Sequence, residues 1–336
     1  MTNRAELAKT FLNGTDWAGI EPVSLAGDAS NRRYDRLVKG NQSVVLMDAP
    51  PDKGEDVRPF VQIANFLTDC GLSAPRILSQ DTEQGFLLLE DLGDDLFARV
   101  AASHPDLETK LYTAATDALV HLHRFQPPKL QAYSPEFMSE MATLAWAWYR
   151  RGITGDADGA NEFGHTFLPI LQEHAPDQTV LIQRDYHAEN LLWLPDRTGV
   201  QQVGLLDFQD ARTGHPAYDL VSLLKDARRD VSGSIETAMI AHYVEKTGCD
   251  AEAFNAAYQV LGVQRNLRIL GVFARLSLHF NKPSYIDLIP RVWNHLRAGL
   301  AHPALAPVAE IVGTLPEPTP QNLQTLKDQA GCVPTL

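Results

Sequence analysis

Two aspartates and one asparagine in the middle of the chain have side chains and a spacing that suit chemistry on a phosphate group. Asp185 and Asn190 lie in the segment 183–190 (QRDYHAEN), and Asp207 follows the next apolar run. Mg²⁺ binds a small number of oxygen ligands, which an aspartate and an asparagine can supply. A further carboxylate can orient an attacking hydroxyl and accept its proton. We therefore predict a catalytic set in which Asn190 and Asp207 bind Mg²⁺ and Asp185 acts as the base.

A simpler interpretation of the same residues is ordinary turn chemistry. Aspartate is common at strand ends, and an asparagine five positions later can occur by chance. Three coincidences favour the catalytic interpretation. The segment 183–190 stands between two apolar strands. Asp207 and Phe208 follow the next strand, and a small β-rich region lies upstream.

Hydrophobic patterns predict a small β-rich region followed by a larger helical one. Alternating apolar residues and turn signals indicate strands. Apolar residues that recur every three or four positions indicate helices. The predicted strands cover 33–38, 43–48, 76–78, 85–90, 179–183, 190–194 and 202–207, and the predicted helices cover 2–12, 57–67, 111–125 and most of 217–300. The candidate catalytic residues thus lie in a short β segment inside the helical region.

The composition limits the partners and the compartment. With 42 acidic and 29 basic residues the net charge is −13, which repels nucleic-acid backbones and anionic lipid surfaces. Cys70, Cys249 and Cys332 are far apart, which argues against disulfides and a thiolate metal site. No stretch is apolar enough to cross a membrane, and the first residues lack the apolar core of a signal peptide. We expect a cytoplasmic protein that binds neither nucleic acid nor membranes.

Taken together, these motifs resemble the protein-kinase-like fold, and within it the aminoglycoside phosphotransferase and choline kinase branch. The segment 183–185 with Asn190 resembles the His-Arg-Asp catalytic loop, and 207–209 (DFQ) stands where kinases have Asp-Phe-Gly. His187 follows the catalytic aspartate as it does in the phosphotransferase branch. Asp219 resembles the structural aspartate that braces this loop. The resemblance implies transfer of a phosphate from ATP, with Mg²⁺, to a hydroxyl group.

The resemblance also implies an α+β fold of two lobes. Residues 1–91 would form a β-rich lobe that binds the nucleotide. Residues 92–336 would form a larger helical lobe for catalysis and substrate binding. Glu90 and Leu92 would lie at the hinge, where the backbone holds the adenine.

Two departures from the kinase pattern affect the phosphate site. The loop that covers the phosphates has one glycine, so Ser30 and the nearby backbone amides are predicted to cradle them. The usual lysine is absent from 44–48. Arg33, on the preceding strand, is our candidate replacement because its planar fork suits phosphate oxygens. That Arg32 and Arg33 are merely solvent-exposed strand charges is an equal alternative.

Three further segments indicate the acceptor. The sequences GDASNRRY at 27–34, LMDAPP at 46–51 and LLLEDLG at 87–93 resemble those of bacterial sugar kinases. These kinases phosphorylate N-acetylmuramate and N-acetylglucosamine at the anomeric hydroxyl during cell-wall recycling. The resemblance therefore implies a small-molecule amino-sugar substrate.

Several residues near the catalytic motif are candidate substrate contacts. His187, Glu189 and Asp210 are predicted to bind the substrate, and His187 would orient the loop rather than take a proton. The aromatic cluster at 146–149 could stack on a sugar, yet such clusters more often belong to a core.

Other acceptors and other classes of protein stay open at this point. An aminoglycoside, choline or homoserine hydroxyl would suit the same catalytic set. The missing lysine makes a catalytically silent kinase-like binding module conceivable, although the retention of Asp185, Asn190 and Asp207 argues against it. Neither the motif Gly-x-Gly-x-x-Gly after a strand nor a P-loop is present, which disfavours an oxidoreductase. The preference for ATP or GTP and the oligomeric state are likewise open.

Overall fold

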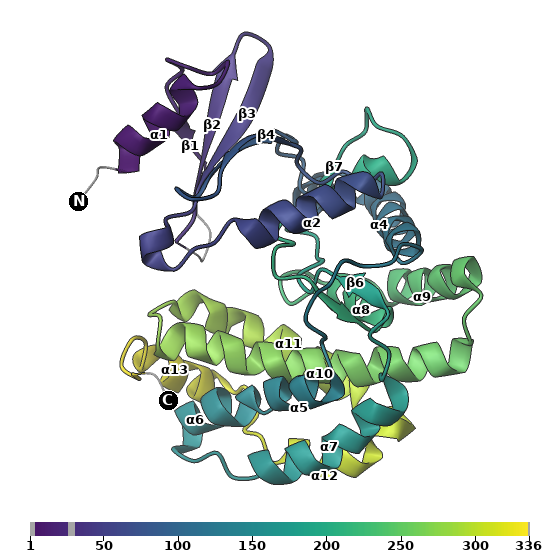
Figure 1. Ribbon diagram of the computed structural model, residues 1–336. Coiled ribbons are helices and arrows are strands. Elements are labelled where there is room, and N and C mark those ends of the chain that lie inside the picture. Colours follow the sequence, from purple (N-terminus) through teal and green to yellow (C-terminus); the bar gives the residue numbers. More distant parts are fainter. Residues whose placement is uncertain (1–3, 26–30, 335–336) are drawn as a thin grey trace. The chain divides into compact units, whose positions relative to one another are not determined.

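The computed structural model describes residues 4–25 and 31–334, and its contacts divide the chain into two compact units (Figure 1). The first unit comprises Met1–Leu122 and Ala188–Ala211, and the second comprises His123–His187 and Arg212–Leu336. The chain therefore passes from one unit to the other three times. The lobe boundary after residue 91 stays a prediction.

The first unit is built on a five-stranded antiparallel sheet with the strand order β1-β2-β3-β5-β4. Gly40, with a φ of +62°, closes the β2–β3 hairpin where the sequence predicts a turn. The strands are β1 Val23–Ser24, β2 Arg33–Lys39, β3 Gln42–Asp48, β4 Ile77–Asp81 and β5 Phe86–Glu90. The strand pairs predicted in this region are thus confirmed, with the bounds of β4 shifted toward the C-terminus.

The two faces of this sheet have different partners because successive strand residues point to opposite sides. Leu37 and Leu46 point to one face, where they join a buried cluster with α1 (Arg4–Asn13). Tyr34 points to the other face, where it lines a pocket together with a side chain of α2 (Arg58–Asp69). We refer to these as the α1 face and the pocket face of the sheet.

A hairpin far along the chain also belongs to the first unit. It consists of β7 (Leu191–Trp193) and β8 (Val203–Leu205), which pair antiparallel. The Leu205 amide donates to the Ser73 carbonyl at 2.9 Å, which joins the hairpin to the earlier part of the unit. Both candidate metal ligands flank this hairpin. The other helices of the unit are α3 Phe97–Ser103 and α4 Glu108–Leu122, with short 3₁₀ turns at Pro51–Lys53, Pro105–Leu107 and Gly199–Gln202.

The second unit is packed around one long helix, α10 (Ala251–Leu278), most of which is buried (Figure 1). A Cβ at Gly271 would collide with the backbone of Leu144, which explains a glycine in the middle of this helix. The aromatic side chains at 146–149 are buried, as predicted for a core cluster. The other helices are α5 Pro135–Ala142, a π-helical turn at Ala145–Arg150, α6 Arg151–Thr154, α7 Ala160–His174, α8 Ala217–Leu224, α9 Gly233–Thr247, α11 Ile289–Gly299, α12 Ala306–Gly313 and α13 Pro320–Asp328, with 3₁₀ turns at Pro283–Leu288 and Pro303–Leu305.

The second unit differs from expectation in two places. The short strand β9 (Arg212–Gly214), which pairs with β6 (Val180–Ile182), is not predicted by the sequence, because its residues Arg212, Thr213 and Gly214 include no apolar side chain. The helical stretch over 217–300 is divided into α8, α9, α10 and α11. Ser232 and Asp250 cap the starts of α9 and α10 with their side chains, which ends the preceding segments.

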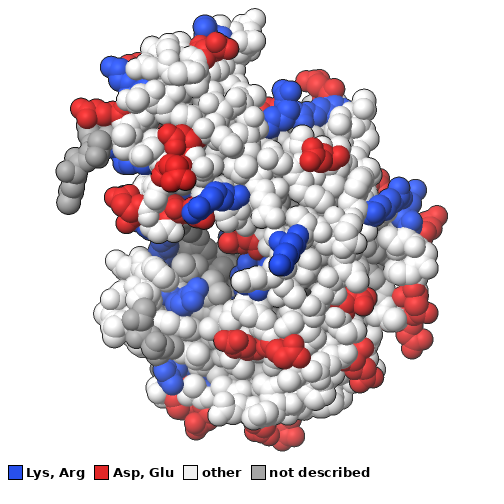
Figure 2. Space-filling model, viewed as in Figure 1, with Lys and Arg blue, Asp and Glu red and all other residues white. Residues whose placement is uncertain are grey.

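Charged side chains of both signs are interspersed over the face drawn in Figure 2. On this face the acidic side chains are spread over several elements. No helix in the described part of the chain is long and apolar enough to cross a membrane.

Candidate active site

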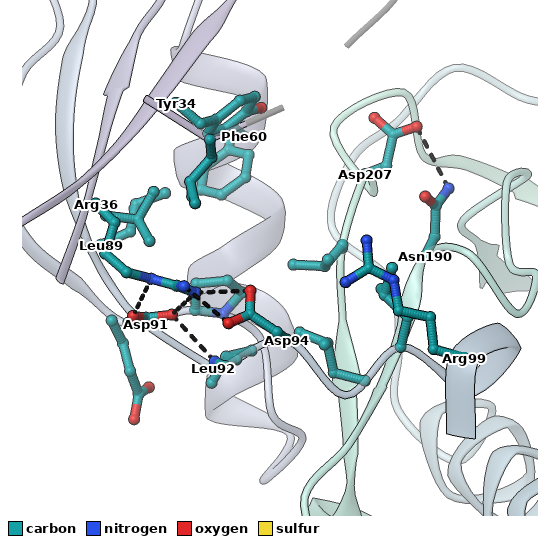
Figure 3. A pocket seen from close by; sticks show the side chains of 18 residues that line it. Tyr34, Arg36, Phe60, Leu89, Asp91, Leu92, Asp94, Arg99, Asn190 and Asp207 are labelled. Atoms are coloured by element: carbon teal, nitrogen blue, oxygen red, sulfur yellow. Dashed lines mark hydrogen bonds and ion pairs between the residues drawn. The ribbon is translucent and has the colours of Figure 1, made fainter. Parts of the chain in front are cut away.

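A pocket of about 350 Å³ opens on the pocket face of the sheet in the first unit (Figure 3). Tyr34 and Phe60 lie together on one side of it, and Asn190 and Asp207 lie on the other. An apolar slot with a few polar groups suits a flat ring such as a nucleobase. The apolar lining consists of Leu25, Val45, Phe60, Pro75, Leu89, Leu92, Leu96, Leu192 and Leu206.

Two of the residues predicted to bind the nucleotide line this pocket. They are Glu90 and Leu92, at the end of β5, whereas Ser30 lies outside the described residues. The Glu90 carboxylate is held by two arginines, 2.8 Å from Arg197 Nη2 and 3.1 Å from Arg76 Nε. The carboxylate is thus occupied, so the backbone of this segment is the better candidate for binding the edge of a base.

Arg36 fixes the segment that follows β5 (Figure 3). Its Nε lies 2.7 Å from the Asp91 carboxylate, and its Nη1 lies 2.8 Å from that of Asp94. Burial disfavours the charge of Asp91, but hydrogen bonds from Ser43 and Arg36 outweigh it and hold the pKa below its usual range. Arg36 is not among the residues predicted from the sequence, although it lies two residues after Tyr34 and so on the same face of β2.

Asn190 and Asp207 lie together at the far side of the pocket (Figure 3). Asn190 Nδ2 donates to Asp207 Oδ2 at 3.4 Å, and Gln209 Nε2 donates to Asp207 Oδ1 at 2.7 Å. Asp207 has a left-handed φ of +56°, a strained conformation of the kind that clusters at functional sites. The described residues contain no group of three His, Cys, Asp or Glu side chains that could hold a metal ion. One carboxylate and one amide instead fit a Mg²⁺ ion that also binds nucleotide phosphates.

The candidate phosphate-binding residue Arg33 is the first residue of β2, and its neighbour Arg32 lies just before that strand. Arg33 lies on the α1 face, 3.0 Å from the Asp35 carboxylate, and is not part of the pocket lining. Its neighbour Arg32 lies 2.8 Å from the Glu55 carboxylate and interacts with Tyr34, which lines the pocket. Because Arg32 interacts with a residue of the pocket lining, it is a second candidate for the phosphate site, and the role of Arg33 stays a prediction.

In the second unit, a buried carboxylate organises the predicted catalytic loop. Asp219 accepts the backbone N–H groups of Gln183 at 2.6 Å and of Arg184 at 2.9 Å. Arg184 has a left-handed φ of +73°, and its carbonyl accepts a bond from the Ser222 hydroxyl at 3.2 Å. Burial raises the pKa of Asp219 to about 7, against the effect of the two N–H donors. Asp219 therefore stands in the bracing position that the sequence indicates.

Asp185, one residue further along the loop, stands among positive charges. Arg265 Nη2 lies 4.0 Å from the Asp185 carboxylate, and the Asp185 side chain is 34% exposed. Burial tends to raise the pKa of Asp185, but the charges of Arg268 and Arg265 outweigh it and hold the pKa below the usual carboxyl value. The side chain is thus an ionised and accessible carboxylate, which is what a general base must be.

The three predicted substrate contacts differ in accessibility. His187 is buried in the second unit, where its Nε2 lies 3.2 Å from Arg228 Nη1. Burial lowers the pKa of His187 to about 4, so the ring is neutral at physiological pH. Glu189 and Asp210 are exposed and belong to the first unit. Their roles as substrate ligands stay predictions.

A pocket with an Asn190–Asp207 pair in one unit and a braced loop that carries Asp185 in the other are features expected of a small-molecule kinase. The chain belongs to the Phosphotransferase enzyme family, whose sequence profile matches residues 21–254. The predicted enzyme class, a phosphotransferase that acts on a hydroxyl group, is thereby confirmed. Kinases of this kind use ATP and a divalent metal ion.

Proteins named N-acetylmuramate/N-acetylglucosamine kinase are similar to this chain over most of its length. The protein from Caulobacter vibrioides is 40% identical, over 91% of this chain and 95% of its own. The protein from Pseudomonas aeruginosa is 34% identical, over 90% and 91% respectively. The resemblance to this group of kinases is therefore confirmed.

Solved structures of related enzymes share the fold. A choline kinase from Streptococcus pneumoniae aligns with a TM-score of 0.61 at 13% identity, over 88% of this chain and 99% of that one. The ADP-bound aminoglycoside phosphotransferase APH(2'')-Ib aligns with a TM-score of 0.56 at 14% identity, over 87% and 96%. The α+β protein-kinase-like fold is thereby confirmed.

The Asp219 brace predicts the behaviour of two variants. Asp219→Ala would leave two buried N–H groups without an acceptor, so we expect the free energy of unfolding to fall by roughly 2–4 kcal/mol. Asp219→Asn keeps one carbonyl oxygen and should lose less than half of that. Urea unfolding followed by circular dichroism measures both. Equal stability of Asp219→Ala and the wild type would show that the loop does not depend on this carboxylate.

Proposed function

We propose that the protein transfers the γ-phosphate of Mg·ATP to the anomeric hydroxyl of N-acetylmuramate or N-acetylglucosamine. The observation that carries the proposal is the ionised and accessible Asp185, presented by a braced loop. The 40% identity to a kinase named for these two sugars supports the choice of acceptor. We expect the enzyme to act in the cytoplasm on small molecules, with no nucleic-acid or membrane partner.

The first unit supplies the nucleotide and metal site in this proposal. The adenine occupies the apolar pocket, against the hinge segment at Glu90 and Leu92. Asn190 and Asp207 would hold Mg²⁺, which neutralises charge on the phosphates when bound. Arg32, fixed by its ion pair with Glu55, contributes the cation that the missing lysine supplies in other kinases. Ser30 stays our candidate for the phosphate cradle.

The second unit supplies the group that acts on the acceptor. The acceptor oxygen forms a bond to the γ-phosphorus, the bond from that phosphorus to the bridging oxygen of ADP breaks, and the hydroxyl proton passes to the Asp185 carboxylate. An anomeric hydroxyl is more acidic than an ordinary alcohol, so it makes modest demands on the base. Neutral His187 positions the loop, and the exposed Glu189 and Asp210 are available for sugar hydroxyls.

The acceptor is tested with free and blocked sugars. The protein is incubated with Mg·ATP and N-acetylmuramate, N-acetylglucosamine, their methyl glycosides, choline, homoserine and an aminoglycoside. We expect a product only from the two free sugars, with the phosphorus–proton coupling of an anomeric phosphate in NMR. Equal turnover of a free sugar and its methyl glycoside would overturn anomeric transfer. Turnover of choline, homoserine or the aminoglycoside alone would overturn the choice of acceptor.

The role of Asp185 predicts a separation of binding from transfer. Asp185→Asn should lower the transfer rate by about 10²–10⁴-fold, because a positioned general base is removed. Its affinity for Mg·ATP, measured by calorimetry, should stay near that of the wild type, since the nucleotide site lies in the other unit. Asp196→Asn, in an exposed turn, is the matched control. A fully active Asp185→Asn enzyme would remove Asp185 from the catalytic set.

Arg33, the first residue of β2, and its neighbour Arg32 give a matched pair of variants. Arg32→Ala should lower kcat/KM for ATP by roughly 10–100-fold, because a charge-assisted contact to phosphate is lost. Arg33→Ala should change it little, since Arg33 lies on the α1 face with Asp35. Steady-state kinetics at varied ATP concentration measures both. The reverse order of effects would restore Arg33 as the phosphate-binding residue.

A further inference from the structure

Three arginines form a row along one face of α10 in the second unit. Arg265, Arg268 and Arg275 are separated by three and by seven residues, so they project within an arc of about 80°. Side chains of a helix lean toward its N-terminus, which directs Arg275 back toward Arg268. We call these three residues the arginine row. It begins beside Asp185, the proposed base.

The arginine row has buried N–H groups that no acceptor meets, at Arg265 and Arg275, whereas Arg268 has a hydrogen bond with Tyr218. Within the described part of the chain, its one ion pair joins Arg265 and Asp185 at 4.0 Å. Arg265 is 4% exposed, and one of its nitrogens, Nη2, donates to Ser222 Oγ at 2.7 Å. Its Nε and Nη1 are buried without a hydrogen-bond partner, as is the Nε of Arg275. Burial and the charge of Arg268 lower the pKa of Arg275, which shows that the two guanidinium groups feel each other.

This pattern indicates a missing anion. Buried N–H groups of a cation are costly when no acceptor meets them, and like charges repel. A carboxylate or a phosphate placed on the arginine row would accept from these groups and balance the charge. The planar fork of arginine matches both anions.

We propose that the arginine row binds the carboxylate of the acceptor and thereby favours N-acetylmuramate over N-acetylglucosamine. The inference rests on the proposed function. N-acetylmuramate carries a lactyl ether whose carboxylate N-acetylglucosamine lacks. Because the row begins beside Asp185, an acceptor with its reacting hydroxyl at that residue has the rest of the row available for an anionic substituent.

The transferring phosphate is the other anion that could reach these arginines. A comparison of substrates can distinguish the two anions. The phosphate is transferred to either sugar, whereas only N-acetylmuramate carries the carboxylate. Arg275 is the better probe of the two cases. Among the charges that lower the pKa of Asp185, those of Arg268 and Arg265 are the largest, and Arg275 stands two turns further along the helix.

The test is a substrate comparison between the wild type and Arg275→Gln. The acceptors are N-acetylmuramate, its uncharged lactyl carboxamide and N-acetylglucosamine. We expect Arg275→Gln to lower kcat/KM for N-acetylmuramate by about 10–100-fold relative to N-acetylglucosamine. The carboxamide should be a poor substrate of the wild type and lose little more in the variant, because one charge of the pair is already absent. Arg275→Lys keeps the charge without the fork and should restore part of the selectivity.

The outcomes separate the possible roles of the arginine row. Arg297→Gln on α11, where the arginine is 64% exposed, is the matched control and should leave the selectivity unchanged. Equal losses for all three acceptors would assign Arg275 to the phosphate or to folding and would overturn the proposal. Equal turnover of N-acetylmuramate and its carboxamide by the wild type would overturn it without any variant. Failure of the wild type to phosphorylate either sugar would instead overturn the proposed function, and this inference with it.

Discussion

A buried carboxylate with two backbone donors holds the loop that carries Asp185, the proposed base. Beyond β6 the chain leaves its strand partner, and the N–H groups of Gln183 and Arg184 have no sheet acceptor there. Asp219 supplies the acceptor for both, so these buried groups are satisfied without a strand. The same bonds hold Arg184 in a left-handed conformation that a non-glycine residue adopts only when its surroundings impose it. This constraint sets the direction in which the Asp185 side chain points from the loop.

Asp219 binds the loop that carries Asp185, yet the two carboxylates have opposite electrostatic surroundings. Asp219 is fully buried and faces dipolar N–H groups, and burial raises its pKa to about 7. Asp185 is partly exposed and faces full positive charges, which hold its pKa below the usual value. A buried carboxylate that fixes a loop can tolerate a raised pKa, because a protonated side chain still accepts hydrogen bonds. A general base must be ionised, and the charges of Arg265 and Arg268 on α10 favour the ionised form of Asp185.

The features that could be predicted from the sequence are those with local signals. The β2–β3 hairpin has a turn residue between two alternating runs, and the loop at 183–190 has its functional residues within eight positions. Features that depend on distant residues had no such signal. Phe60 and Arg99 reach the pocket from α2 and α3, and Arg265 meets Asp185 from a helix 80 residues later in the chain. Nothing in the sequence near these residues marks them.

The choice between Arg32 and Arg33 shows a different limit. Alternation along β2 places Arg33 and Asp35 on one face and Tyr34 on the other, and Arg32 lies just before the strand. Both faces contain polar and charged residues, because one face packs against α1 and the other lines the pocket. The pattern therefore shows which residues share a face but not which face meets the nucleotide. That information comes from α1 and α2, which lie outside the strand.

The absent lysine and the position of Arg32 form one consistent arrangement. On the pocket face of β3, Met47 is fully buried and pairs with Tyr34 across the hairpin. A lysine at such a site would need a partner for its charge, and methionine needs none. Arg32, just before the neighbouring strand β2, has that partner in Glu55. Phosphate transfer requires a fixed positive charge within reach of the phosphates rather than a particular residue on a particular strand. In the proposed function the planar fork of Arg32 supplies this charge from just before β2, so the absence of the lysine is compatible with catalysis.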